Sequence, residues 1–434
     1  MVGIGTIVVG IVIMLVLLLS GLHVASVMIL TALLGLLFGF GPDILAPLGN
    51  MMWSELNSFI LTAIPLYILM GELLVQSEVA QRMYRSISDW LTWLPGGLLH
   101  TNIASSAMFA AISGSSVATA ATIGTIAFPT FRAQNYDERW VAGSIASGAT
   151  LGILIPPSIN LIIYGAITET SIAALFIAGF VPGVLLALFF MITIAIAAVL
   201  YPAIAGSGKA GQSSAGRIKR LADLIPPLII FALIIGSIYL GWATPTEAAA
   251  VGVVAALILA AINRKLSFAM LHASLLGTVR VTAMILLILT GAFFLNFSMG
   301  MLGVPGQISS FISALDVEPL TLIACLVLLY LVLGCFLDAL AMMITTIPIL
   351  FPIILGIGYD PVWFGVFVVI MCELALLTPP VGMNLYVVQG VRNRGQLTDV
   401  IRGVMPFFIG ILILVALISI FPQIVLWLPQ AMAG

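Results

Sequence analysis

The stretches LGILIPPSINLIIYG (residues 151–165) and LALLTPPVGMNLYVV (residues 374–388) share one pattern at a spacing of 223 positions. The superimposed residues are Pro156 with Pro379, Pro157 with Pro380 and, after one further residue of slip, Asn160 with Asn384. Two successive prolines remove two amide donors, so neither stretch can continue as a regular helix. In a membrane-embedded chain, a duplicated and proline-broken segment indicates a binding site for a substrate and an ion.

The duplication extends upstream of the proline pairs. The same shift pairs Phe128 with Phe351, Pro129 with Pro352, Tyr136 with Tyr359, Asp137 with Asp360 and Trp140 with Trp363. Each half of the chain is therefore predicted to contain two apolar arms, a broken span and an unbroken helix. The predicted ranges are 97–112, 116–131, 139–167 and 171–200 in the first half, and 319–335, 341–357, 362–390 and 403–428 in the second.

Composition places the chain in a membrane. Charged residues make up 7% of it, against about 25% in an average soluble domain, while hydrophobic residues make up 62% and the mean hydropathy is +1.28. Several apolar runs approach the ~20 residues that cross a bilayer as a helix. We predict an all-α polytopic membrane protein in contact with the lipid bilayer. With 14 basic and 16 acidic residues, it offers no basic stripe for nucleic acid.

Further apolar spans and two polar segments complete the predicted organisation. The spans lie near 4–19, 21–40, 55–77, 224–242, 246–262, 276–299 and 307–314. An amphipathic segment at 78–93 is expected to lie in the membrane interface, and the Gly- and Ser-rich residues 202–222 are predicted to be a cytoplasmic linker. The predicted units are scaffold helices with the interfacial helix (1–94), a first hairpin and broken helix (95–170), scaffold helices with the linker (171–300), a second hairpin and broken helix (301–402), and a C-terminal helix (403–434).

Loop charges suggest how the two halves are oriented. Basic residues in short loops tend to stay on the cytoplasmic side. The linker and the loop with Arg264 and Lys265 satisfy this rule only if the paired arms turn back as re-entrant helical hairpins. The second hairpin must then enter from the opposite face, so the halves are predicted to be inverted-topology repeats. The expected location is the cytoplasmic (inner) membrane of a bacterium or archaeon, with multiple passes.

The broken backbone supplies the predicted chemistry. Unpaired carbonyls are costly in hydrocarbon and persist only where protein, water or an ion satisfies them. The first proline pair frees carbonyls around Gly152 and Ile155, which are expected to face the serine-rich tip at 113–116. Such oxygens suit sodium, and the helix that starts near Ser158 presents a partial positive charge suited to a substrate carboxylate. The equivalent residues of the second half are Thr378, Gly382 and Asn384.

Each of these features also has a purely structural interpretation. A proline in a membrane helix is often only a kink, and Ser113, Ser115 and Ser116 can be small residues that permit close helix packing. Asp338, at the second tip, is either a functional residue or the cap of the following arm. Glu373, inside an apolar span, is either a site residue or a buried structural partner.

Several long motifs resemble the large membrane subunit of tripartite ATP-independent periplasmic (TRAP) transporters. They are GSSVATAATIG at 114–124, LGILIPPSINLIIYG at 151–165, GCFLDALAMMITTIPILFPI at 334–353, GYDPVWFG at 358–365 and LLTPPVGMNLYV at 376–387. The resemblance covers nearly the whole chain. It implies a scaffold and a mobile transport domain that moves as an elevator, coupled to sodium ions and without another cofactor. It also implies a small four-helix membrane subunit and a periplasmic substrate-binding protein as partners, and a small organic acid as substrate.

The resemblance also assigns site residues. The first sodium site falls to Ser113, Gly114, Gly152, Ile155 and Pro157, and the second to Gly334, Thr378, Pro380, Gly382 and Met383. A substrate held between the tips is expected at Ser115, Ser116, Ser158, Asn160, Asp338 and Asn384.

Two other classes of protein share features with this sequence. An intramembrane aspartyl protease needs two facing aspartates, but the predicted topology puts Asp137 and Asp360 in loops on opposite faces. The three histidines lack an evident partner arrangement with Ser116, and the HExxH motif is absent, so we predict that the chain is not an enzyme. A stand-alone sodium–dicarboxylate symporter of the same superfamily would share the architecture without needing a binding protein, and it is the alternative function.

Overall fold

The computed structural model describes residues 3–206, 220–314, 318–380 and 382–433, and in these ranges the chain is helical without β-strand. Seven of the described helical segments are long and apolar enough to cross a membrane. They are Phe59–Gln76, Ile172–Leu200, Leu221–Tyr239, Pro245–Ile262, Phe268–Leu302, Ala339–Gly356 and Leu397–Ile420. The predicted all-α polytopic class is confirmed. Most of the predicted linker, residues 207–219, lies outside the described residues.

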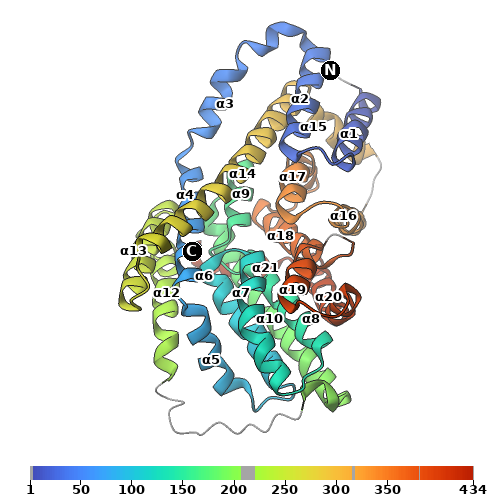
Figure 1. Cartoon of the computed structure of the whole chain (residues 1–434). Helices are drawn as coiled ribbons and strands as arrows, with labels where there is room; N and C mark the ends of the chain where they lie inside the picture. Colours follow the sequence, from blue (N-terminus) through green and yellow to red (C-terminus); the bar gives the residue numbers. More distant parts are fainter. Residues whose placement is uncertain (1–2, 207–219, 315–317, 381, 434) are drawn as a thin grey trace.

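The N-terminal part forms five helices and two short 3-10 turns (Figure 1). Their bounds are α1 (Ile4–Leu19), α2 (Val24–Phe40), η1 (Pro42–Leu45), α3 (Leu48–Leu56), η2 (Phe59–Thr62), α4 (Ala63–Gln76) and α5 (Val79–Leu91). The span predicted near 55–77 is present but begins at Phe59, because α3 ends at Leu56 with Asn57 as its C-cap and Ser58 is extended. Both residue types favour turns and caps over helix interiors. α5 is the predicted amphipathic segment, and it buries Met83 and Tyr84.

The first hairpin and broken helix follow. Their bounds are α6 (Leu98–Ser113), α7 (Ser116–Ala133), α8 (Glu138–Thr150), η3 (Leu151–Ile153) and α9 (Ile159–Thr168), followed by α10 (Ile172–Leu200) and η4 (Pro202–Ala205). From Val141 to Thr150 every residue of α8 is buried. Most of those residues are Ala, Gly, Ser or Thr, which let helix backbones approach closely. Neighbouring helices can therefore pack closely around α8, next to the break that follows it.

The second half repeats the series. Its bounds are η5 (Leu221–Leu224), α12 (Ile225–Tyr239), α13 (Pro245–Ile262), α14 (Phe268–Met301), α15 (Val304–Ala314), α16 (Pro319–Gly334), α17 (Ala339–Gly356), α18 (Pro361–Leu377), α19 (Met383–Arg392), α20 (Leu397–Ile420) and α21 (Gln423–Ala433). The single helix predicted at 403–428 is wrong, because Pro422 disfavours a helical backbone at Phe421 and so separates α20 from α21. α14 starts earlier than predicted, because Ser267 caps it through the amide of Met270.

Helix packing separates two regions of the molecule (Figure 1). In one region α14 runs past α2 and α4, and α13 packs on α4 and α12. In the other, α8 packs against α6, α7 and α20, while α19 packs against α7 and α8. The second broken helix therefore lies against the first hairpin, although the two are far apart in the sequence.

Candidate substrate and cation site

The tip of the first hairpin turns at Gly114 and Ser115. Gly114 has φ +61°, a left-handed conformation that glycine adopts without strain, and it ends α6. Ser115 begins α7 as its N-cap, and its Oγ accepts a hydrogen bond from the Ala118 amide at 3.3 Å. The Ser113 hydroxyl lies 3.1 Å from the Thr119 hydroxyl. The turn therefore gathers hydroxyl groups at the end of the hairpin.

The break between α8 and α9 leaves carbonyls without their helical donors. The residues four positions after Gly152 and Ile153 are the two prolines, which have no amide hydrogen. The Ser158 hydroxyl donates a hydrogen bond to the Ile153 carbonyl and also caps α9. Ser158 is thus occupied in closing the break, and Gly152 is the neighbouring carbonyl whose helical donor is missing.

The first tip and the first break are in contact. A Cβ built on Gly152 would lie 3.2 Å from the carbonyl carbon and oxygen of Ser115 and from the amide nitrogen of Ser116. A Cβ on Gly114 would lie 3.2 Å from the Pro157 carbonyl oxygen. Because both positions are glycine, the two backbones approach closely. The structure therefore places three of the residues predicted for the first cation site, Gly114, Gly152 and Pro157, at the contact between the tip and the break.

The second tip also lies against its own broken helix. A Cβ on Gly334 would lie 2.7 Å from the Ala375 Cβ, so α16 meets α18 with no room for a side chain between them. Asp338 accepts a hydrogen bond from the Ala341 amide at 2.6 Å and caps α17. The capping interpretation of Asp338 is therefore confirmed, and a further role of its charge stays a prediction.

The second break is closed by hydrogen bonds of its own. The Thr378 amide donates to the Ala375 carbonyl at 3.1 Å, and the Gly382 amide donates to the Thr378 carbonyl at 2.9 Å. The Tyr386 hydroxyl donates to the Pro380 carbonyl at 3.0 Å. The Thr378 and Pro380 carbonyls, both part of the predicted second cation site, thus each already accept one hydrogen bond. A carbonyl has two lone pairs, so each can still bind an ion.

One side chain joins the two halves at the site. The Asn384 amide nitrogen donates to the Ser116 hydroxyl at 2.6 Å and to the Ala146 carbonyl at 3.1 Å. Asn384 is fully buried and Ser116 is 3% exposed. Hydrogen bonds with no competing water hold their geometry well, so the first tip is tied to the half-helix that follows the second break.

Asn160, Met383 and Glu373 take no part in the hydrogen bonds described above. Asn160 is 3% exposed, and its amide nitrogen has no hydrogen-bond partner among the described residues. Met383 is 40% exposed at the start of α19, and its side chain takes part in none of the contacts described above. Glu373 is fully buried, and neither carboxyl oxygen has a hydrogen-bond partner within the described ranges. The two interpretations of Glu373 therefore stay open.

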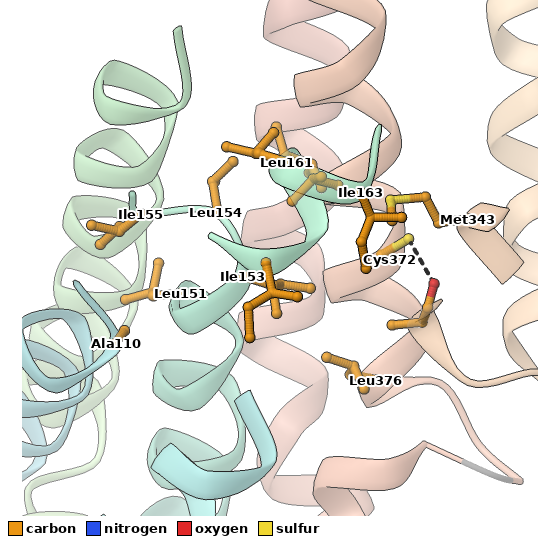
Figure 2. Close-up of a cluster of buried hydrophobic side chains, with 14 of the residues drawn as sticks. Ala110, Leu151, Ile153, Leu154, Ile155, Leu161, Ile163, Met343, Cys372 and Leu376 are labelled. Atoms are coloured by element: carbon orange, nitrogen blue, oxygen red, sulfur yellow. Dashed lines mark hydrogen bonds between the residues drawn. The ribbon is translucent and has the colours of Figure 1, made fainter. Parts of the chain in front are cut away.

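Apolar side chains surround the first break (Figure 2). Those that the break itself contributes are Leu151, Ile153, Leu154 and Ile155. Beside Ile163 and Met343, the Cys372 thiol donates to the Ala339 carbonyl at 3.3 Å. In the part of the chain that the structure describes, no three His, Cys, Asp or Glu side chains form a metal-ligating group. The oxygen atoms that meet at this break belong to the backbone and to the Ser158 hydroxyl group.

A charged cluster joins the corner between α7 and α8 to the corner between α19 and α20. Its ion pairs are Arg132–Glu138 (3.1 Å), Arg392–Glu138 (3.0 Å), Arg394–Glu138, Arg139–Asp399 (3.4 Å) and Arg392–Asp399 (3.4 Å). Partial burial acts to raise the pKa of Glu138, but hydrogen bonds from three arginines outweigh it and lower that pKa to about 2. This cluster was not predicted from the sequence, where its signal is the concentration of charged residues at the ends of two repeat-related segments.

Two proline-broken helices of this membrane protein thus meet hairpin tips at buried polar groups. This architecture is that of a secondary transporter. Residues 11–424 match the family described as "Tripartite ATP-independent periplasmic transporter, DctM component". The chain therefore belongs to the family of TRAP transporter large permease proteins, and the resemblance seen in its motifs is confirmed.

Individual relatives agree with this assignment. The sialic acid TRAP transporter large permease protein SiaM of Vibrio cholerae is 32% identical over 89% of this chain and 90% of its own. The C4-dicarboxylate TRAP transporter large permease protein DctM of Pseudomonas aeruginosa is 33% identical over 90% and 91%. The solved structure of the Alcanivorax borkumensis YdaH transporter has a TM-score of 0.61 at 14% identity, covering 89% of this chain and 90% of that one, which supports the fold.

The two aspartates weighed as a protease pair have structural roles. Asp137 accepts a hydrogen bond from the Arg139 amide at 2.9 Å and caps α8. Asp360 accepts one from the Val362 amide at 2.7 Å and caps α18. Both are helix N-caps, and the relatives are named as permeases, which points to transport rather than catalysis.

Proposed function

We propose that this chain is the membrane-spanning large subunit of a TRAP transporter that takes up a small organic acid, driven by sodium. The observation that carries the proposal is the contact of each hairpin tip with a proline-broken helix of its own half. At the first of these contacts, Gly152 lies against the backbone of Ser115 and Ser116. Broken backbone at membrane depth persists where an ion or substrate satisfies it.

Two sodium sites are part of the proposal. The first comprises Ser113, Gly114, Gly152, Ile155 and Pro157, and the second comprises Gly334, Thr378, Pro380, Gly382 and Met383. Met383 would contribute only backbone atoms, since its side chain is exposed. Carbonyl and hydroxyl oxygens are hard ligands that suit a small cation.

The proposed substrate is a carboxylate. The two relatives above are named for sialic acid and for C4-dicarboxylates, both of which carry carboxylate groups. The anion would lie between the tips, near the N-termini of α9 and α19, where partial positive charge favours it. The residues proposed to bind it are Ser115, Ser116, Ser158, Asn160, Asp338 and Asn384.

Transport would follow an elevator motion. Residues 95–170 and 301–402 would form the moving domain and the remaining helices the scaffold, with the two halves inverted across the membrane. A small membrane subunit and a periplasmic binding protein are the proposed partners. The relatives come from bacteria, so we place the chain in a bacterial inner membrane; they give no support to an archaeal source. Copurification of both partners would separate this function from that of a stand-alone symporter.

Thermal unfolding of the purified, detergent-solubilised chain tests sodium binding without any substrate. A ligand that binds only the folded state raises the unfolding midpoint by mass action. We expect a higher midpoint in sodium chloride than in potassium chloride at equal ionic strength. The difference should vanish in Ser116→Leu and Thr378→Leu and persist in Thr125→Leu, which changes an exposed threonine of α7. Equal midpoints of the wild-type chain in the two salts would contradict sodium coupling.

A further inference from the structure

Asn160 and Asn384 occupy the same place in the two halves but have different hydrogen bonds. Each lies in the first turn of the half-helix that follows a proline pair. Asn384 donates from its amide nitrogen to Ser116 and to the Ala146 carbonyl, which uses the two donors that an amide possesses. The amide nitrogen of Asn160 is buried and has no partner among the described residues.

The sequence explains the difference. The shift of 223 positions holds at the tips, because Ser115 and Asp338 cap α7 and α17 in the same manner. Applied to Ser116, the same shift leads to Ala339, which has no hydroxyl group. The bond that holds the second half-helix to the opposite tip therefore has no side-chain counterpart for Asn160.

An unpaired donor at this depth is costly. A buried amide donor without a partner loses its hydrogen bonds to water and gains none in exchange. Asn160 also lies at the N-terminus of α9, a helix of 10 residues, where the backbone dipoles favour negative charge. A donor that is buried, unpaired and set at a positive helix end suits an anionic oxygen.

We infer that the two asparagines have separate tasks. Asn160 donates a hydrogen bond from its amide to a carboxylate oxygen of the substrate. Asn384 is a positioning residue that holds the first tip in place through Ser116 and is not free to bind substrate. This inference rests on the proposed function and narrows it, because it removes one residue from the predicted substrate-binding set.

The first test needs no ligand. Leucine has nearly the shape of asparagine, so replacing an unpaired buried amide with it is neutral or stabilising, whereas replacing a bonded amide is destabilising. We expect Asn160→Leu in the full chain to keep or raise the unfolding midpoint, and Asn384→Leu to lower it. Equal losses in the two variants would overturn the inference, since they would show that Asn160 has a partner.

The second test uses succinate and N-acetylneuraminate as probes in sodium chloride. We measure how each acid shifts the unfolding midpoint. For an acid that shifts the midpoint of the wild type, Asn160→Ala should weaken the binding by about tenfold to a hundredfold. The sodium-dependent shift should be unchanged. Asn384→Ala should reduce the sodium-dependent shift as well. An acid response in Asn160→Ala equal to that of the wild type would overturn the role of Asn160. The absence of any acid response in the wild type would count against the proposed substrate class, and the leucine pair would still decide whether Asn160 carries a free donor.

Discussion

Gly143 of α8 and Gly403 of α20 lie in direct backbone contact. A Cβ on Gly143 would overlap the carbonyl oxygen of Gly403, and a Cβ on Gly403 would overlap the carbonyl oxygen of Arg139. No side chain fits between these helices at this point. Since α8 leads into the first break, α20 supports the backbone that carries the candidate site.

Adding a methyl group at this contact should destabilise the protein. We expect Gly143→Ala and Gly403→Ala each to cost about 1–3 kcal/mol, because overpacking forces the helices apart. The unfolding midpoint measures the effect. Gly236→Ala in α12 is the matched control, since a Cβ there meets nothing within 4 Å, and it should leave the midpoint unchanged or slightly raised. A similar loss at all three glycines would argue against the backbone contact.

Removing the charge of Glu138 should destabilise the corner cluster. Its side chain is 18% exposed and bonded to three arginines, so we expect Glu138→Gln to cost about 1–3 kcal/mol at neutral pH. Glu55→Gln, which changes an exposed carboxylate of α3, should have little effect.

The effect of Glu138 should also depend on pH. The pKa of Glu138 in the folded protein is about 2, below the usual ~4.3 of a free glutamate. The stabilisation by its charge is therefore complete above the pKa of the free group and is lost as the pH falls toward the folded pKa. The difference in midpoint between wild type and Glu138→Gln should shrink as the pH is lowered below about 5. A constant difference across this range would show that the ion pairs do not carry the effect.

Substitutions at Asp338 separate its cap from its charge. Asp338→Asn keeps an oxygen that can accept from the Ala341 amide, whereas Asp338→Ala removes the cap and should cost about 1 kcal/mol. If the charge belongs to the site, both variants should lose the sodium-dependent shift. Ser171→Ala removes the cap of α10, so it should lower the midpoint and keep the shift. A normal shift in Asp338→Asn would leave Asp338 with the capping role alone.

The bond between Ser116 and Asn384 should appear as energetic coupling. In a double-mutant cycle with Ser116→Ala and Asn384→Ala, we expect the two losses to be non-additive by about 0.5–3 kcal/mol. The pair Ser116→Ala and Ser298→Ala is the control, since Ser298 bonds the Ala32 carbonyl in the packing of α14 on α2. Additive losses in the first cycle would mean that the hydrogen bond contributes nothing to stability.

Local chemistry made much of the fold predictable from the sequence. Gly114 and Ser115 mark the first tip, and the proline pairs mark the breaks, because these residues act on their own backbone. The separation of α20 from α21 had such a signal in Pro422, yet a continuous apolar run hid it. The Gly143–Gly403 contact and the bond from Asn384 to Ser116 join distant segments. Such contacts depend on how whole helices pack, which residue order alone does not specify.

The methyl group of Ala339 breaks the symmetry between the duplicated halves. A serine there would restore the oxygen that its counterpart Ser116 offers to Asn384. Because α17 begins at this position and packs against α9, that hydroxyl could accept from Asn160, which on our proposal donates to the substrate instead. On the proposed assignment, we expect Ala339→Ser to weaken the binding of an acid that depends on Asn160, because the present alanine leaves that amide nitrogen without an internal acceptor.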